Sequence, residues 1–242
     1  MNLGEKLNKK NFRHENKYFI NFFDYSILKS RLEFLMKKDS YSDQNGNYNI
    51  RSLYFDDIRN SSLFEKQSGI LVRKKYRIRI YNLNDDIIKL EKKSRIGHFI
   101  NKETVRISKE QYYKIISKNY DFLIDSKKSL LREFYLDLKI NMYKPEVIVD
   151  FVREAFTYNI NNIRITFDKK LESGLKSVDL FNKKLVKTTA IDEPKMILEV
   201  KYDSFLPDFI KNALQISASQ RYAISKYVIC RKYIKTNKWE DN

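Results

Sequence analysis

Apolar and polar residues alternate along most of this chain, which is the pattern of strands that bury one face. The segment 72–81, VRKKYRIRIY, shows it most clearly, because Ile78 and Ile80 fall on one face while Arg77 and Arg79 fall on the other. Seven further segments have the same pattern, so the sequence predicts eight strands. The other seven are 13–20, 48–56, 86–94, 101–108, 145–158, 162–171 and 195–202.

Helical spacing of apolar residues occurs between and after these strands. Ser108 and Gln111 have the spacing of a capping box, and Pro207 stands where the first turn of a helix accepts proline. The main predicted helices cover 24–37, 129–140 and about 218–233. Strands with inserted helices, followed by helices, indicate an α+β fold on an antiparallel sheet, with flanking helices and a C-terminal helix. No linker or internal repeat divides the chain, so we expect a single domain over 1–242.

Composition narrows the possible partners. The chain has 242 residues, of which 42% are hydrophobic and 14% aromatic, so it is a globular chain. Its formal net charge of +17 favours polyanions: nucleic acid, an anionic membrane surface or phosphorylated small molecules. Cys230 is the one cysteine and lies in an apolar run, which predicts a core residue and excludes an internal disulfide. No run is long and apolar enough for a membrane helix, so we expect a cytoplasmic protein.

The polar faces of the predicted strands repeat Arg, Lys and Glu. Lys17 shares a face with Glu15, and Lys93 shares one with Glu91. For any single strand, such a polar face is explained simply if it lies on the outside of the protein and contacts solvent. Repetition over eight strands favours an antiparallel β-barrel whose charges point inward, into a tunnel that holds a polyanion. Phosphate oxygens match the fork of arginine, and isolated carboxylates among the bases suit a divalent cation.

The resemblance of the chain to a known family rests on an ordered set of motifs. They are FRHENKYFI, IRSLYFDD, RIRIY, LEKKS, VREAFTY, IRITFDKKL, MILEVKY and RYAISKY. Together they resemble the VTC domain, named from the vacuolar transporter chaperone complex, within the CYTH-like triphosphate tunnel metalloenzymes. The resemblance covers about residues 11–231.

This resemblance implies an eight-stranded antiparallel tunnel that binds ATP, triphosphate or inorganic polyphosphate with Mn²⁺ or Mg²⁺. It implies a polyphosphate-polymerase-type phosphotransferase, which moves the terminal phosphoryl group of ATP to a polyphosphate chain. The catalytic residues expected from it are Arg77, Arg79, Lys93 and Arg164. The expected phosphate-binding residues are Lys17, Lys66, Arg153, Ser225 and Lys226, and the expected metal ligands are Glu199 and Glu15. For Glu91, ion pairing with Arg or Lys is favoured over metal binding.

The opening motif departs from the wider superfamily. Relatives begin with Glu-x-Glu-x-Lys, whereas this chain has Arg13 at the first acidic position. Losing one metal carboxylate weakens the expectation of triphosphate hydrolysis. Hydrolysis and non-catalytic polyphosphate binding nevertheless stay open as alternatives. A nucleic-acid-binding protein is a more remote alternative, because the Arg residues share their faces with Glu, and no stable nucleic acid partner is expected. Partner proteins and membrane association are left open.

Overall fold

All eight predicted strands are present in the computed structural model, which describes residues 14–97, 99–192, 194–215 and 221–236. They are β1 (His14–Ile20), β3 (Asn47–Asp56), β4 (Val72–Tyr81), β5 (Asn84–Ile96), β6 (Phe99–Ile107), β7 (Lys144–Tyr158), β8 (Ile163–Ser173) and β10 (Met196–Tyr202). Two short strands, β2 (Lys37–Lys38) and β9 (Thr188–Thr189), pair with β7 and β8. Arg13 lies outside the described residues.

The chain forms two compact units. Unit 1 comprises Met1–Tyr48, Arg153–Lys169 and Asp192–Ile224, and unit 2 comprises Asn49–Val152, Lys170–Ile191 and Ser225–Asn242. Strands β3, β7 and β8 each have residues in both units. The strand order is β1-β10-β8-β7 in unit 1 and β7-β3-β4-β5-β6 in unit 2. Every pairing with an assigned register is antiparallel, as the sequence predicts. A single domain over 1–242 stays a prediction.

Helices flank the strands of each unit, and one helix ends the described chain. They are α1 (Phe22–Leu35), α2 (Ser61–Gln67), α3 (Lys109–Ile116), α4 (Asp121–Ile124), α5 (Ser129–Lys139), α6 (Asp208–Ala213) and α7 (Lys226–Thr236). The predicted capping box of α3 is present: Ser108 Oγ accepts from the Gln111 backbone, and the Gln111 side chain accepts from the Ser108 backbone. Within the described residues, no helix is long and apolar enough to cross a bilayer.

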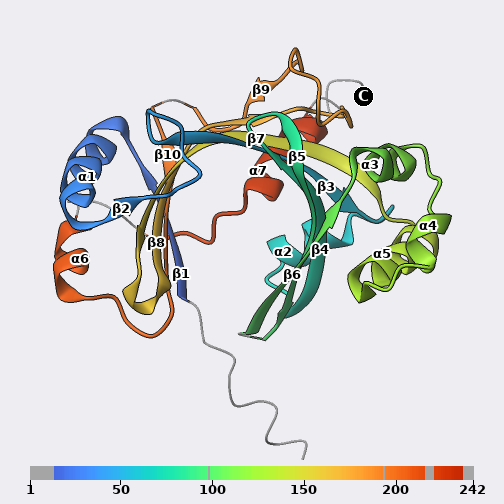
Figure 1. Cartoon of the computed structure of the whole chain (residues 1–242), viewed down its shortest axis with the longest axis horizontal. Coiled ribbons are helices and arrows are strands. Elements are labelled where there is room, and N and C mark those ends of the chain that lie inside the picture. Colours follow the sequence, from blue (N-terminus) through green and yellow to red (C-terminus); the bar gives the residue numbers. More distant parts are fainter. Residues whose placement is uncertain (1–13, 98, 193, 216–220, 237–242) are drawn as a thin grey trace, which may run out of the picture. The chain divides into compact units, whose positions relative to one another are not determined.

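In unit 1, helices α1 and α6 cover one face of the strands (Figure 1). Leu28 and Leu32 of α1 are fully buried against Phe167 of β8 and Leu198 of β10. The side chain of Asn21 caps α1 by accepting a hydrogen bond from the Asp24 backbone at 2.8 Å. The opposite face of these strands therefore keeps its polar residues clear of the helices.

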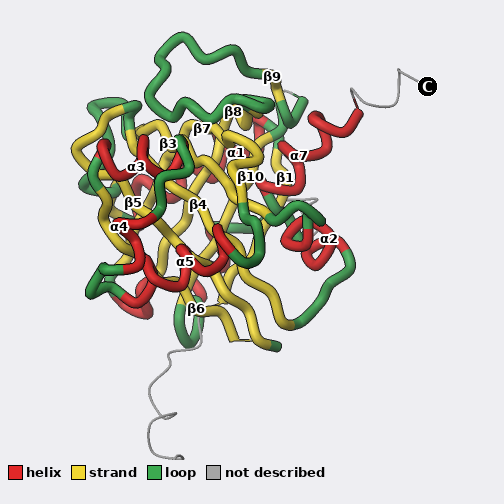
Figure 2. Tube along the Cα trace, turned by 90° about the vertical axis from the view of Figure 1, so that its right-hand side faces the viewer, coloured by secondary structure: helices red, strands yellow, loops and turns green. Residues whose placement is uncertain are grey.

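In unit 2, helices α3, α4 and α5 cover one face of β3–β6 (Figures 1 and 2). Phe134 of α5 packs against Tyr76, Ile78 and Leu90, all of which are fully buried. Because side chains alternate along a strand, burying Tyr76 and Ile78 here sends Arg77 and Arg79 to the other face. The core thus decides which face carries the charges.

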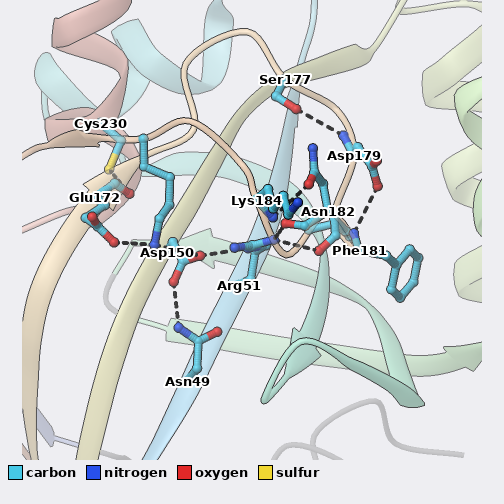
Figure 3. Close-up of polar contacts among 12 residues, drawn as sticks. Asn49, Arg51, Asp150, Glu172, Ser177, Asp179, Phe181, Asn182, Lys184 and Cys230 are labelled. Carbon is cyan, nitrogen blue, oxygen red and sulfur yellow. Dashed lines mark hydrogen bonds and ion pairs between the residues drawn. The ribbon is translucent and has the colours of Figure 1, made fainter.

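A buried ion pair fastens the loop 174–187 to the helix-covered side of unit 2 (Figure 3). Arg51 is 1% exposed and bonds Asp150 Oδ2 through Nε at 2.7 Å. Its Nη1 donates to the carbonyls of Leu180 and Asn182 at 3.1 and 2.7 Å.

Cys230 of α7 is fully buried, as predicted, and burial raises the pKa of its thiol to about 12.

Two helix boundaries differ from the prediction. The last helix begins at Lys226 rather than near 218, because Arg221 bridges to Tyr18 and the Tyr222 backbone donates to Lys17 O at 2.9 Å. Residues 222–225 have no regular secondary structure, and 216–220 lie outside the described residues. Pro207 is the N-cap of α6 rather than part of its first turn, since its ψ of 144° is extended. Helices α2 and α4 were not predicted.

Candidate functional site

Charged side chains concentrate on the face of the unit 2 strands that lies opposite helices α3, α4 and α5. The register sets Arg77 opposite Glu91, and Arg79 opposite Lys89, so their side chains share one face. We call this set the basic face. Its members are Lys75, Arg77, Arg79, Lys89, Glu91, Lys93, Lys102 and Arg106, from β4, β5 and β6. It has seven cations and a single acid, and this excess invites an anionic ligand.

Glu91 is the acid at the centre of the basic face. Its carboxylate lies 2.6 Å from Arg77 Nε and 2.5 Å from Lys102 Nζ, and the residue is 2% exposed. Burial alone would raise the pKa of Glu91, but the charges of Arg77, Arg79 and Lys102 outweigh it and hold the pKa well below the usual range. The prediction that Glu91 acts by ion pairing is confirmed.

Arg77 and Arg79 are held by neutral hydroxyl groups of β3 as well. Arg77 Nη1 donates to Tyr54 Oη at 2.8 Å, and Arg79 Nε donates to Ser52 Oγ at 3.0 Å. Arg79 is only 7% exposed, and burial together with the charge of Arg77 lowers its pKa. Without a ligand, this pair of like charges is therefore a local electrostatic cost.

The start of α7 lies beside the basic face. Tyr227 packs on Tyr54 with ring centroids 5.1 Å apart, and Lys75 Nζ lies 6.0 Å from both rings. Lys226 Nζ lies 5.0 Å from the centre of the Phe151 ring. Ser225 Oγ accepts from the Val228 backbone at 3.5 Å, which is a long contact at the first turn. These contacts bring the predicted Ser225 and Lys226 to the same side as Arg77.

Of the other two predicted site residues of unit 2, Lys93 lies on the basic face and Lys66 does not. Lys93 is on the basic face, between Lys75 and Lys102 in the register. Lys66 lies in the last turn of α2, on a helix rather than on the charged strands. The helix itself is tied to β4, because Ser62 Oγ donates to the Lys74 carbonyl at 3.0 Å.

Unit 1 carries a second charged group, in which acids and bases alternate. The register of β1 and β10 sets Lys17 opposite Glu199, and Glu15 opposite Lys201. Lys17 Nζ lies 2.7 Å from the Glu15 carboxylate and 3.8 Å from the Glu199 carboxylate, and Lys201 pairs with Glu199. Burial opposes the charge on both lysines. The two carboxylates outweigh burial at Lys17 and raise its pKa, whereas burial prevails at Lys201 and lowers its pKa to about 8.

Arg153 and Arg164 of unit 1 are paired with aspartates. Arg153 forms a bidentate pair with Asp168, at 2.6 Å from Nε and 2.8 Å from Nη2, and Asp168 is 1% exposed. Arg164 Nη2 bonds Asp39 at 2.5 Å and Tyr48 Oη at 2.8 Å. We call Glu15, Lys17, Asp39, Arg153, Arg164, Asp168, Glu199 and Lys201 the paired cluster. Its four cations face four acids.

The fit of a divalent cation depends on Glu15 and Glu199. In the described part of the chain, no group of three or more His, Cys, Asp or Glu side chains could hold a metal ion. Two carboxylates do converge within 4 Å of one cation, the Lys17 ammonium. Mg²⁺ is commonly bound by one or two carboxylates plus substrate phosphates, so this donor pair fits such an ion.

The predicted site residues therefore form two groups. Arg77, Arg79, Lys93, Ser225 and Lys226 gather in unit 2, and Glu15, Lys17, Arg153, Arg164 and Glu199 gather in unit 1. Alternation in 72–81 puts Lys75 on the face of Arg77 and Arg79, whereas Lys89, Lys102, Arg106 and Tyr54 were not predicted as site residues. Alternation in 101–108 puts Lys102 and Arg106 on one face, and that signal could have found them.

Comparison with known proteins bears on the family and the fold. The family model of the VTC domain matches residues 12–235. HpAC1 from Hippeastrum, a proposed adenylyl cyclase with a dominant triphosphatase activity, superposes with a TM-score of 0.53 at 13% identity, covering 90% of this chain and 95% of that one. A proposed adenylate cyclase from Bacillus halodurans has a TM-score of 0.48 at 14% identity, covering 94% and 91%. No curated protein matches the chain. At these identities the likeness to HpAC1 is one of fold.

Proposed function

Because the chain belongs to the VTC domain family, we propose that it handles triphosphate-type substrates, which bind on the basic face of unit 2. The observation that carries this proposal is the set of seven cations around one acid on three neighbouring strands. Arg77 and Arg79 offer planar guanidinium groups that suit phosphate oxygens. A bound polyanion would offset the repulsion between them.

The finer proposal is a polyphosphate-polymerase-type phosphotransferase, which moves the terminal phosphoryl group of ATP to a polyphosphate chain. Phosphoryl transfer requires aligned reactants and neutralisation of the transferring group, with little covalent help from the protein. Arg77, Arg79 and Lys93 would supply this neutralisation in unit 2. Lys226 and Ser225 would bind nucleotide or product chain beside them. The acceptor phosphate is the nucleophile, so no protein nucleophile is required.

The residues of unit 1 have proposed roles of their own. Glu199 and Glu15 would hold Mn²⁺ or Mg²⁺, which neutralises phosphate oxygens when bound. Lys17 neutralises both carboxylates, and Arg164 would bind phosphate through the part of its guanidinium that Asp39 and Tyr48 leave uncovered, since its side chain is 35% exposed. Arg153 is engaged by Asp168 at two nitrogens, so its proposed contact with phosphate is the weakest of these.

Two alternatives use the same residues. A triphosphate or polyphosphate hydrolase would bind the substrate in the same way and pass the phosphoryl group to water. A non-catalytic polyphosphate-binding module would need no metal, and the ammonium of Lys17 already satisfies both Glu15 and Glu199. The three functions differ in their products.

Incubation with ATP and Mn²⁺, followed by separation of chain products, ADP and free phosphate, tests the proposal. Chain growth matched by ADP supports the polymerase, phosphate release without chains supports the hydrolase, and binding without turnover supports the module. A matched control is the double change Lys183→Gln and Lys184→Gln, which removes two exposed charges of unit 2 from a loop. If neither ATP, tripolyphosphate nor polyphosphate binds the wild-type protein, the proposal is wrong.

A further inference from the structure

The ends of β4, β5 and β6 carry exposed apolar side chains beside the β5–β6 turn, which lies at the lower end of these strands in Figure 1. The set comprises Leu71, Val72, Ile96, Phe99 and Ile100, and we call it the apolar tip. Each of the five is 49–64% exposed. Hydrophobic side chains scattered singly are normal on a surface, whereas a contiguous set marks an interaction site.

The register makes three residues of the apolar tip contiguous. Val72 is the partner of Ile96, and Ile96 is the partner of Phe99, so the three form a row across one face. The backbone of Gly97 donates to the Leu71 carbonyl at 3.0 Å and so keeps Leu71 beside this row. Ile100 follows Phe99 on the opposite face, where it is the partner of Arg95.

Cations surround the apolar tip without any acid in the same segments. Residues 70–75 and 93–102 contain six Lys and Arg residues and no Asp or Glu. Arg73 is the register partner of Arg95, immediately next to the apolar row. Both arginine side chains form hydrogen bonds with the backbone near the tip. Arg73 donates to the Ile70 carbonyl, and Arg95 Nε donates to Gly97 O at 2.7 Å. Their charged groups are thereby fixed at the border of the apolar set.

We propose that the apolar tip inserts into the interface of an anionic lipid bilayer, with the bordering cations contacting the headgroups. Proteins bind membrane surfaces by two contributions together. Apolar side chains enter the boundary between headgroups and acyl chains, and Lys and Arg side chains attract anionic lipids. Lys75, Lys93 and Lys102 also belong to the basic face, but Arg73 and Arg95, which border the apolar row, do not, so the inference stands apart from the proposed function of that face.

Other occupants fit the apolar tip less well. Nucleic acid would favour aromatic side chains that stack on bases, but four of the five tip residues are aliphatic. A second copy of the chain would bring two sets of six cations together, and like charges across an interface are unfavourable. An anionic lipid surface both accommodates aliphatic side chains and presents negative charge, so it matches both features of the tip.

Vesicle flotation with the full chain tests this inference. Wild-type protein is mixed with phosphatidylcholine vesicles that contain phosphatidylserine, and with pure phosphatidylcholine vesicles. Saturating tripolyphosphate is present throughout, so that the basic face is occupied. We expect binding to the anionic vesicles and at least tenfold weaker binding to neutral ones. Absence of binding to anionic vesicles, or equal binding to anionic and neutral vesicles, would overturn the inference.

A triple variant then separates the apolar tip from general charge attraction. Val72→Thr, Ile96→Thr and Phe99→Thr keep strand-forming residues at exposed positions, so folding and turnover should be unchanged. The matched control is Ile124→Thr, Leu136→Thr and Ile140→Thr, which removes apolar side chains that are 49–68% exposed in helical parts of unit 2. We expect the tip variant to lose vesicle binding at least tenfold and the control to keep it. Equal binding by both variants would contradict the inference, as would self-association of the wild-type protein through the tip without vesicle binding.

Discussion

The paired cluster of unit 1 and the basic face of unit 2 use the same residue types with opposite charge balance. In unit 1, Lys17, Arg153 and Arg164 each contact a carboxylate at 2.5–2.7 Å. In unit 2, the basic face has seven cations and one acid, Glu91, which pairs with Arg77 and Lys102. The difference teaches that the charges of unit 1 largely stabilise one another, whereas those of unit 2 leave an excess that a ligand can neutralise. Substitutions in the two regions should therefore have different consequences.

The largest expected effect is on turnover when the basic face loses its central arginines. Arg77→Gln with Arg79→Gln should lower phosphotransfer at least about 10³-fold, since removing one preorganised donor at a reacting group costs roughly 10²–10³-fold. Product formation from ATP is the measurement. The Lys183→Gln and Lys184→Gln protein should keep its rate within about twofold. A similar loss in that control would mean that net charge alone is responsible.

A cation removed from the paired cluster should instead cost stability. Arg153→Gln leaves Asp168 buried and without its bidentate partner, and breaking such a pair costs about 3–5 kcal/mol. At about 2–4 °C per kcal/mol, the melting temperature should fall by roughly 6–20 °C. Adding Asp168→Asn to this variant should restore part of the loss, because no charge is then left unpaired. An unchanged melting temperature in Arg153→Gln would contradict the view that the charges of the paired cluster stabilise one another.

An acid removed from the paired cluster should affect metal use. Glu199→Gln keeps the shape of the side chain and removes one carboxylate charge, so Mn²⁺-dependent turnover should fall by roughly 10–100-fold. Binding of tripolyphosphate should be largely retained, because the basic face is untouched. Titration of activity with Mn²⁺, alongside tripolyphosphate binding, measures both. Full activity at saturating metal would show that Glu199 is not a ligand that matters.

The smallest expected effect concerns the orientation of Arg77. Tyr54→Phe removes the hydroxyl that accepts from Arg77 Nη1 at 2.8 Å, and one such hydrogen bond contributes about 0.5–1.5 kcal/mol. We expect a roughly 3- to 10-fold lower kcat and a melting temperature lower by about 1–6 °C. Tyr113→Phe, at a half-exposed tyrosine of α3, is the matched control. A loss confined to stability would make Tyr54 a structural residue only.

Strand positions could be predicted from the sequence because alternation is a local signal. The boundaries of β4 agree with the predicted 72–81, and those of the other seven long strands lie within two residues of the prediction. Helix α3 was predictable for the same reason, since both partners of its capping box lie within four residues. The start of α7 was not, because the pairing of 221–222 with β1 is a contact between distant parts of the chain.

The candidate site was predictable by residue type more than by arrangement. Alternation placed Arg77 and Arg79 on one face, and the family motifs pointed to Lys93, Glu199 and Lys226. The register, however, decides which acids reach which bases. No local pattern shows that Glu91 lies between Arg77 and Lys102, or that Arg153 is engaged at two nitrogens by Asp168. Those pairings distinguish cations held by an acid from cations in excess.

Thermal melting with and without tripolyphosphate tests most directly whether the basic face is the binding surface. At about 100 times its dissociation constant, the ligand should stabilise the wild-type protein by roughly 2.7 kcal/mol, or about 5–11 °C. The protein with Arg77→Gln and Arg79→Gln should melt at a lower temperature without ligand, because the buried Glu91 loses its Arg77 partner, and should also lose most of the ligand-induced shift. An equal shift in both proteins would contradict the assignment of the basic face.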